Sequence, residues 1–223
     1  MLREIQGPAG RLEALLDEPS RQTGVNDQGL LESGRTERPR AAVVFGHPHP
    51  QYGGTMHTKA AYQSAKALAR IGCAVLRFNF RGVGRSEGQY AEGAGERDDF
   101  AAALEFMAQR YPGSPLWAGG MSFGAWVGLT VGARDPRVSV LIGVGMPVNR
   151  YEFSEVGNSR KAKFFIHGEF DELCSVHDLQ AFYAQAAEPK ELAVIETANH
   201  LFEGKVSLVG DALEDLLSDW PEV

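Results

Sequence analysis

Short continuous apolar runs alternate along the chain with stretches in which apolar residues recur at helical spacing. The runs AAVVFGH (41–47), CAVLRFNF (73–80), PLWAGG (115–120), VSVLIGVG (138–145), AKFFIHG (162–168) and ELAVIE (191–196) are typical of buried parallel strands. Helical spacing covers residues 58–72, 96–111, 122–135, 176–188 and 207–220. Repeated strand–helix units predict an α/β fold with a mostly parallel twisted sheet and helices on both faces.

The N-terminal region differs from this alternation. Residues 2–6 (LREIQ) and 11–18 (RLEALLDE) flank the turn sequence Gly-Pro-Ala-Gly, which predicts an antiparallel hairpin. The polar run at 19–40 has no periodicity and is predicted to be a surface loop inserted into the fold. At 223 residues, the chain suits a single domain that spans 1–223.

Charge and composition narrow the classes of partner. A net charge of −7 argues against nucleic acid or an anionic membrane surface. No apolar run approaches the ~20 residues of a membrane span, and no secretory signal is present at the N-terminus. Cys73 and Cys174 fit no disulfide or metal pattern, so the predicted location is the cytoplasm. Whether the chain forms a homodimer stays open.

The pattern Gly-x-Ser-x-Gly occurs twice, at 84–88 around Ser86 and at 120–124 around Ser122. A nucleophile elbow requires a strand directly before the serine and a helix directly after it. Only Ser122 has both, because PLWAGG precedes it and an Ala/Gly-rich helix follows. Ser86 lies in a polar, Gly-rich loop whose glycines suit a tight bend. We therefore predict that Ser122 is a nucleophile and that Ser86 is a turn residue.

A serine becomes an effective nucleophile only when a base, itself oriented by an acid, takes its proton. With an elbow of this kind, the order along the chain is serine, acid, histidine. Three histidines follow Ser122. His167 precedes the best acids, and His177 lies in the first turn of a polar helix. His200 follows the strand ELAVIE after a short loop, so it is the predicted base.

The acid should leave the end of a neighbouring strand. The stretch FFIHGEFDELC (164–174) offers Glu169, Asp171 and Glu172. Asp171 lies in a short turn three residues beyond the strand, which leaves enough chain to bend back towards His200. We predict Asp171 as the acid that holds the imidazole in one tautomer, with Glu172 as the alternative.

An oxyanion hole requires two backbone N–H donors. One should be Phe123, directly after the nucleophile, and the other should come from the loop HPHPQYGG at 47–54. The two prolines of this loop have no N–H and cannot donate. His49 and Gln51 are therefore the nearest candidates, with Tyr52 behind them.

The spacing of His47 and His49 also raises the question of a metal site. Zinc hydrolases with paired histidines normally have an aspartate and a further histidine nearby. Here the residues that follow the motif and Pro50 are Gln, Tyr, Gly and Gly. We therefore predict no metal and no other cofactor.

Six segments taken together resemble the α/β-hydrolase superfamily: HPHPQYGGTM, LRFNFRGVGRSEG, GERDD, GMSFGAW, HGEFDE and NHLF. They are most similar to small, lidless bacterial hydrolases related to dienelactone hydrolases and short-chain carboxylesterases, from about residue 40 to the C-terminus. The resemblance implies an α/β-hydrolase fold, a triad of Ser122, Asp171 and His200, and a structural role for RGVGRSEG. Dienelactone relatives use cysteine as the nucleophile, so the serine here favours ester over lactone chemistry.

Many members of the superfamily carry a lid after the strand that follows the elbow helix. Here only residues 147–160 lie between that strand and the next, which is too few for a lid domain. Tyr151 and Phe153 are expected to line one wall of an open substrate pocket, together with Tyr52 and Phe202.

The sequence therefore predicts a serine hydrolase that cleaves a small carboxylic ester or thioester through an acyl-enzyme intermediate. The predicted partner is a small-molecule ester. A peptidase or amidase on the same triad is one alternative, and a non-catalytic binding protein with a hydrolase fold is another.

Overall fold

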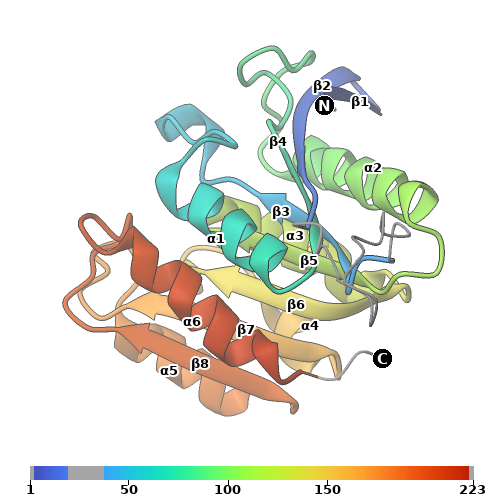
Figure 1. Cartoon of the computed structure of the whole chain (residues 1–223). Helices are drawn as coiled ribbons and strands as arrows, with labels where there is room; N and C mark the ends of the chain where they lie inside the picture. Colours follow the sequence, from blue (N-terminus) through green and yellow to red (C-terminus); the bar gives the residue numbers. More distant parts are fainter. Residues whose placement is uncertain (1–2, 20–37, 221–223) are drawn as a thin grey trace, which may run out of the picture.

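A computed structural model describes residues 3–19 and 38–220, and its core is an eight-stranded sheet (Figure 1). Neighbouring strands follow the order β1-β2-β4-β3-β5-β6-β7-β8. The strands are β1 (Glu4–Gly7), β2 (Gly10–Asp17), β3 (Ala42–Gly46), β4 (Ala74–Phe78), β5 (Leu116–Met121), β6 (Val138–Val144), β7 (Ala162–Gly168) and β8 (Lys190–Ile195). The predicted surface loop at 19–40 lies almost entirely outside the described residues.

The sheet is parallel from β4 to β8, and the N-terminal hairpin joins it antiparallel through β2. Every residue of β3, β4, β5 and β7 is buried, which explains why these strands have mostly apolar sequences. Gly46 pairs with Gly120, so β3 and β5 end at the same edge of the sheet. The loops that follow these two strands therefore lie side by side.

Six α-helices and one short 3₁₀ helix accompany the sheet in the described part of the chain. They are η1 (Pro50–Tyr52), α1 (Lys59–Arg70), α2 (Ala94–Arg110), α3 (Phe123–Arg134), α4 (Ser154–Asn158), α5 (Val176–Gln185) and α6 (Val206–Ser218). Helices α1 and α6 lie next to each other on one face, and α2 and α3 cover the other (Figure 1). The predicted α/β fold, with its N-terminal hairpin and helices on both faces, is confirmed.

Each face of the sheet has its own hydrophobic core. On the α1–α6 face, Val43 packs in a cluster with Leu68 and Leu213. On the opposite face, Val44 belongs to a cluster that contains Phe100. Consecutive residues of one strand thus enter opposite cores, as the alternation of side chains along a strand requires.

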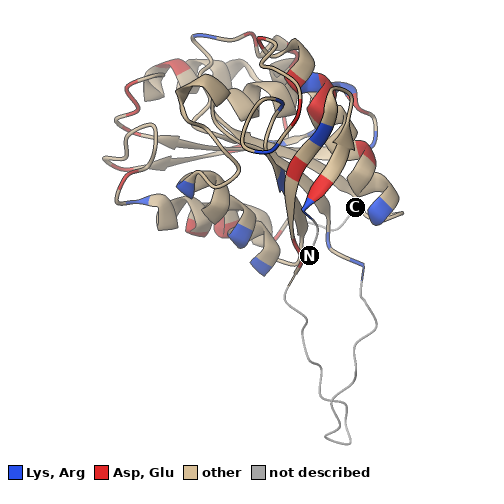
Figure 2. Ribbon diagram, turned by 90° about the horizontal axis from the view of Figure 1, so that it is seen from above, with Lys and Arg blue, Asp and Glu red and all other residues tan. Residues whose placement is uncertain are grey.

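Charged residues occur along the helices, the loops and the N-terminal hairpin, where Figure 2 shows both red and blue segments. Between β6 and β7, the chain forms only a loop and the five-residue helix α4. The absence of a lid domain in this segment agrees with the prediction.

None of the helices within 3–19 and 38–220 has the length and apolar character needed to cross a membrane.

Candidate active site

Ser122 lies at the tip of a sharp turn between β5 and α3. Its backbone has φ 54° and ψ −119°, a conformation that non-glycine residues rarely adopt and that costs roughly 1–3 kcal/mol. Its N–H donates to the carbonyl of Val144 on β6 (2.9 Å), which fixes the turn to the neighbouring strand. The strand before it and the helix after it produce the elbow geometry predicted for this serine.

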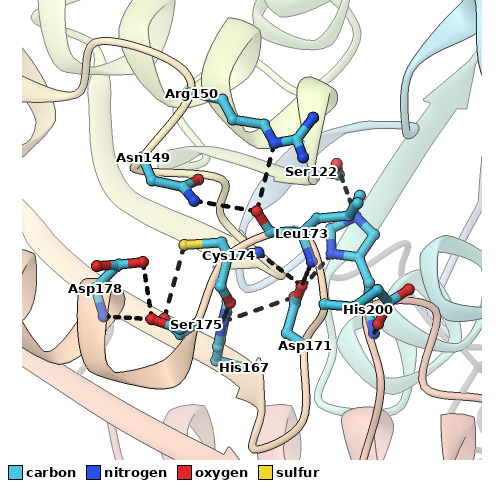
Figure 3. A network of polar contacts seen from close by, with 11 residues as sticks. Ser122, Asn149, Arg150, His167, Asp171, Leu173, Cys174, Ser175, Asp178 and His200 are labelled. Carbon is cyan, nitrogen blue, oxygen red and sulfur yellow. Dashed lines mark hydrogen bonds and ion pairs between the residues drawn. The ribbon is translucent and has the colours of Figure 1, made fainter.

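The structure brings the three predicted residues into one hydrogen-bonded line. Ser122 Oγ lies 3.0 Å from Nε2 of His200, and Nδ1 of His200 lies 2.7 Å from Oδ2 of Asp171. Figure 3 shows Ser122 and Asp171 on opposite sides of the His200 ring. All three residues are buried, with exposed fractions of 7% or less. This arrangement allows the imidazole to take a proton from the hydroxyl while the carboxylate stabilises the imidazolium.

The carboxylate of Asp171 is held from two sides. Its Oδ1 accepts the N–H groups of Leu173 (2.9 Å) and Cys174 (3.0 Å), which leaves Oδ2 to the His200 ring. Burial alone would raise the pKa of Asp171, but the hydrogen bond and charge of His200 and the Cys174 amide outweigh it and lower the pKa. Asp171 is therefore charged at neutral pH.

The other two candidate acids bind the backbone of the loop that carries the base. Glu172 Oε2 accepts the N–H of His200 (3.0 Å), and Glu169 Oε2 accepts the N–H of Thr197 (2.7 Å). Each of the three carboxylates on the loop after β7 therefore contacts the loop after β8. Only Asp171 reaches the imidazole, and Glu172 instead holds the main chain beneath it.

His167 lies behind the acid and is fully buried. Its Nε2–H donates to the carbonyl of Cys174 (2.8 Å) and lies 3.6 Å from Oδ2 of Asp171. Burial lowers the pKa of His167, so its ring is neutral. His167 therefore packs against Asp171. Among the described residues, it forms no hydrogen bond with Ser122.

The loop after β3 meets the elbow, as the common edge of β3 and β5 requires. The ring of His49 lies 4.8 Å from that of Phe123, measured between ring centroids. Within the described residues, the backbone N–H groups of Phe123 and His49 donate to no other group. Among the described residues, both amides are therefore free of a competing acceptor, and Phe123 directly follows Ser122.

The Gln51 amide, predicted as an alternative donor, is not available. It donates to Nδ1 of the His49 ring (3.2 Å), because His49 is the N-cap of the short helix η1. This correction leaves His49 as the candidate in the loop. Histidine is not among the preferred N-cap residues, so no local sequence pattern indicates this contact.

Both ring nitrogens of His47 are hydrogen-bonded to the backbone. Its Nδ1–H donates to the Pro48 carbonyl (2.6 Å), and its Nε2 accepts the N–H of Phe80 (3.1 Å). Burial lowers the pKa of His47 to about 4, so the ring is neutral over the physiological range. In the described segments, no group of three or more His, Cys, Asp or Glu side chains is arranged to hold a metal ion.

The four predicted pocket residues have different surroundings. Tyr52 is 86% exposed, and its ring lies beside that of His49, with 4.6 Å between ring centroids and 45° between ring planes. Tyr151 is half-buried and contacts Phe123, with 6.2 Å between ring centroids.

Phe202 and Phe153 do not form an open wall of the site. Phe202 is fully buried in the core on the α1–α6 face, so its prediction as a pocket residue is corrected. Phe153 is also buried, and it lines a cavity of about 480 Å³ between the 148–158 segment and α5 that contains none of Ser122, Asp171 or His200.

Two aromatic residues near the elbow were not predicted. Tyr90, in the loop before α2, places its hydroxyl oxygen 3.1 Å from Nε2 of His49. Trp126, one turn into α3, stacks on Tyr151 with 4.3 Å between ring centroids and 13° between ring planes. The rings of His49 and Phe123 join Tyr52, Tyr90, Trp126 and Tyr151 into one aromatic cluster beside Ser122.

The sheet and the serine elbow define an α/β-hydrolase fold, and comparisons with known proteins agree with this class. The sequence model of Hydrolase_4, described as serine aminopeptidase, S33, matches residues 37–152. An α/β serine hydrolase homologue from Coxiella burnetii is 33% identical, with 96% of this chain and 95% of that chain covered and a TM-score of 0.84.

A lidless α/β serine hydrolase from Xanthomonas campestris is 30% identical, with 97% of this chain and 93% of that chain covered and a TM-score of 0.85. An uncharacterized protein of Rickettsia prowazekii is 33% identical over 222 residues, which cover 96% of this chain and 87% of the relative. The chain belongs to the α/β serine hydrolases of the Hydrolase_4 family.

Proposed function

We propose that this protein is a serine esterase that cleaves small carboxylic esters or thioesters through an acyl-enzyme intermediate. The observation that carries the proposal is the hydrogen-bonded line from Ser122 through His200 to Asp171, with separations of 3.0 and 2.7 Å. A hydroxyl, an imidazole and a charged carboxylate in this order are the groups that acyl transfer requires.

In the proposed reaction, Ser122 Oγ attacks the ester carbonyl while Nε2 of His200 takes the hydroxyl proton. The tetrahedral intermediate collapses, the bond to the leaving alcohol or thiol breaks, and His200 donates the proton to that group. Water then attacks the acyl-enzyme with His200 again as the base, which releases the carboxylic acid and restores Ser122.

The unpaired amides of Phe123 and His49 are the proposed oxyanion donors. They flank the elbow from α3 and from the loop after β3, and no described group competes for their protons. A donor fixed in place before the reaction stabilises the developing charge without reorganisation, and one such donor is commonly worth about 10²–10³ in kcat.

The segment between β6 and β7 supports a preference for short acyl groups. With only the five-residue helix α4, it has too little chain to enclose a long alkyl group. Each CH₂ that leaves water contributes ~0.8 kcal/mol, so the gain should stop after the first few carbons.

The proposal is tested with p-nitrophenyl esters of increasing acyl length, with Ser122→Ala as the control for background hydrolysis. We expect kcat/KM to peak between acetyl and hexanoyl and then to level off or fall. A steady rise to palmitoyl would show that the acyl group is enclosed and would contradict the preference. Equal turnover by Ser122→Ala would contradict the proposed mechanism itself.

A peptidase or amidase is the second candidate, because the matching family model is described as a serine aminopeptidase. Such an activity uses the same three residues but must also protonate an amine leaving group. Aminoacyl p-nitroanilides distinguish the two functions when they are compared with p-nitrophenyl esters of the same amino acids. Turnover of the anilides within about tenfold of the esters would favour the peptidase.

A further inference from the structure

We propose that Tyr90 is a positioning residue for the oxyanion hole: through the His49 ring, it holds the His49 backbone amide in place. This inference rests on the proposed esterase function. Tyr90 lies in the loop before α2, 41 positions away from His49 in the sequence, and its hydroxyl oxygen is 3.1 Å from Nε2 of His49.

The hydrogen bonds fix which ring nitrogen of His49 carries the proton. Nδ1 accepts the backbone N–H of Gln51 (3.2 Å), so Nδ1 must be unprotonated. In a neutral imidazole, the proton is then on Nε2, which donates it to the hydroxyl oxygen of Tyr90. Burial lowers the pKa of His49, and the charge of Glu96 offsets only part of this effect, so the neutral form is favoured.

The His49 ring is therefore bonded at both nitrogens and packed against three aromatic rings. The Gln51 amide binds one nitrogen and Tyr90 binds the other, and the ring also packs against Tyr52 (4.6 Å), Tyr90 (5.3 Å) and Phe123 (4.8 Å). Of these contacts, only the one with Tyr90 links His49 by a hydrogen bond to a segment outside its own loop.

Ring orientation and backbone position are coupled at this residue. His49 is the N-cap of η1 and its Nδ1 accepts the Gln51 N–H, so rotation of its ring breaks the side-chain hydrogen bond that caps this helix. The free backbone N–H belongs to the same residue. A loss of the Tyr90 contact should therefore let the ring rotate and move the amide relative to Phe123.

A displaced oxyanion donor has a specific kinetic effect. The hole binds the transition state more strongly than the ground state, so a defect lowers kcat and leaves KM nearly unchanged. Because the amide is shifted and not removed, the loss should be smaller than the ~10²–10³ that accompanies deletion of a donor. We expect Tyr90→Phe to lower kcat on the order of tenfold.

The test is a double-mutant cycle on a short-chain p-nitrophenyl ester, with wild type, Tyr90→Phe, His49→Asn and the double variant. Asparagine is a favoured N-cap whose side-chain oxygen replaces Nδ1 as the acceptor for Gln51, but it does not extend to Tyr90. Burst titration of active sites normalises each kcat to the folded, reactive fraction.

Tyr183→Phe is the matched control. The Tyr183 hydroxyl also makes one hydrogen bond, to the Lys190 carbonyl (3.2 Å), but it joins α5 to β8 away from the elbow. We expect Tyr183→Phe to keep wild-type kcat and KM, and Tyr90→Phe to have no further effect once His49→Asn is present.

Three outcomes overturn the inference: an unchanged kcat in Tyr90→Phe, an effect on KM alone, or a loss in Tyr90→Phe that persists undiminished beside His49→Asn. Each of these is distinct from failure of the proposed function, which would appear as wild-type ester turnover that survives Ser122→Ala.

Discussion

The chain contains two Gly-x-Ser-x-Gly segments, and only one of them has the geometry of a nucleophile elbow. Ser122 and Ser86 have the same pattern of glycines and the same exposed fraction, 7%. Burial therefore does not separate a candidate nucleophile from a structural serine. The difference lies in what each hydroxyl contacts and in what each pair of glycines allows.

The hydroxyl of Ser86 forms two hydrogen bonds with the backbone. It donates to the Asn79 carbonyl (2.7 Å) and accepts the N–H of Glu13 (2.9 Å), which fastens the loop after β4 to β2. The hydroxyl of Ser122 instead faces a histidine ring that is held by a carboxylate. A base near a hydroxyl prepares it for attack, whereas two backbone partners keep it in place.

The first prediction separates the two serines by covalent labelling and by rate. Ser122→Ala should abolish labelling by a fluorophosphonate and lower kcat by ~10⁶, the loss found when a serine protease loses its nucleophile. Ser86→Ala removes only structural hydrogen bonds, so labelling should remain. Labelling that persists in Ser122→Ala would overturn the assignment.

The second prediction concerns Asp171 and His200, which accompany Ser122 but not Ser86. Asp171→Asn should lower kcat by ~10⁴, because the amide no longer holds the productive tautomer of His200 or stabilises its charge. Glu172→Gln is the control, since it keeps an oxygen able to accept the His200 N–H now bound at 3.0 Å. We expect a change of less than about tenfold for this control, measured on the same ester. If Glu172→Gln had the larger effect, Glu172 would be the acid.

The elbow and its partners could be predicted because their signals are local. An apolar run before Ser122 and a helix after it are visible in the sequence, and the order of acid and histidine then selects Asp171 and His200. The sheet follows from the same runs, since buried parallel strands have continuous apolar sequences.

The surroundings of the elbow depend on contacts that no local pattern shows. The bond between Tyr90 and His49 joins residues 41 positions apart, and the availability of each loop amide depends on the orientation of one ring. Phe202 was expected in the pocket because it follows His200. Its backbone turns there with φ 55°, and the side chain enters the core on the α1–α6 face.

The third prediction compares a glycine from each segment. A Cβ on Gly124 would lie 2.4 Å from the carbonyl carbon of Gly46, at the end of β3, and 2.4 Å from the oxygen of His47, and both are backbone atoms. A Cβ on Gly84 would lie 2.5 Å from Oε2 of Glu13 and 2.7 Å from Nδ2 of Asn79, which are ends of side chains, and its φ of 57° is left-handed. Gly124→Ala should therefore lower the free energy of unfolding by more than ~3 kcal/mol, beyond the common range for overpacking.

Gly84→Ala adds the strain of a left-handed conformation, about 1–2 kcal/mol, and displaces the Glu13 and Asn79 side chains. Its total loss should stay below that of Gly124→Ala, because side chains can move aside more easily than backbone. Urea denaturation of both variants at pH 7 measures the difference. A larger loss for Gly84→Ala would show that the loop around Ser86, and not the elbow, is the more tightly constrained segment.

The last prediction concerns His47, which lies between the two segments: its Nε2 accepts the N–H of Phe80, at the start of the Ser86 loop, and its carbonyl lies against Gly124. Burial lowers the pKa of His47 from 6.5 to about 4 in the folded state. Well above pH 6.5, the ring is neutral in both folded and unfolded chains, so it adds no pH dependence. As the pH falls through 6.5 towards 4, the unfolded chain takes up the proton before the folded chain does, and stability is lost with a slope that rises to at most about 1.4 kcal/mol per pH unit.

His47→Gln removes this titration and keeps an acceptor for the Phe80 amide. Its free energy of unfolding should be lower than that of the wild type at pH 7, because the shape of the buried ring is lost. Between pH 6.5 and 5, however, the wild type should lose about 1.6 kcal/mol more than the variant, because the unfolded ring is already half protonated at pH 6.5. The other titrating groups are common to both proteins, so their contribution cancels in the difference. Parallel stability curves for the two proteins over this interval would show that His47 is also protonated in the folded state. Water would then reach its ring between the Ser86 loop and the elbow.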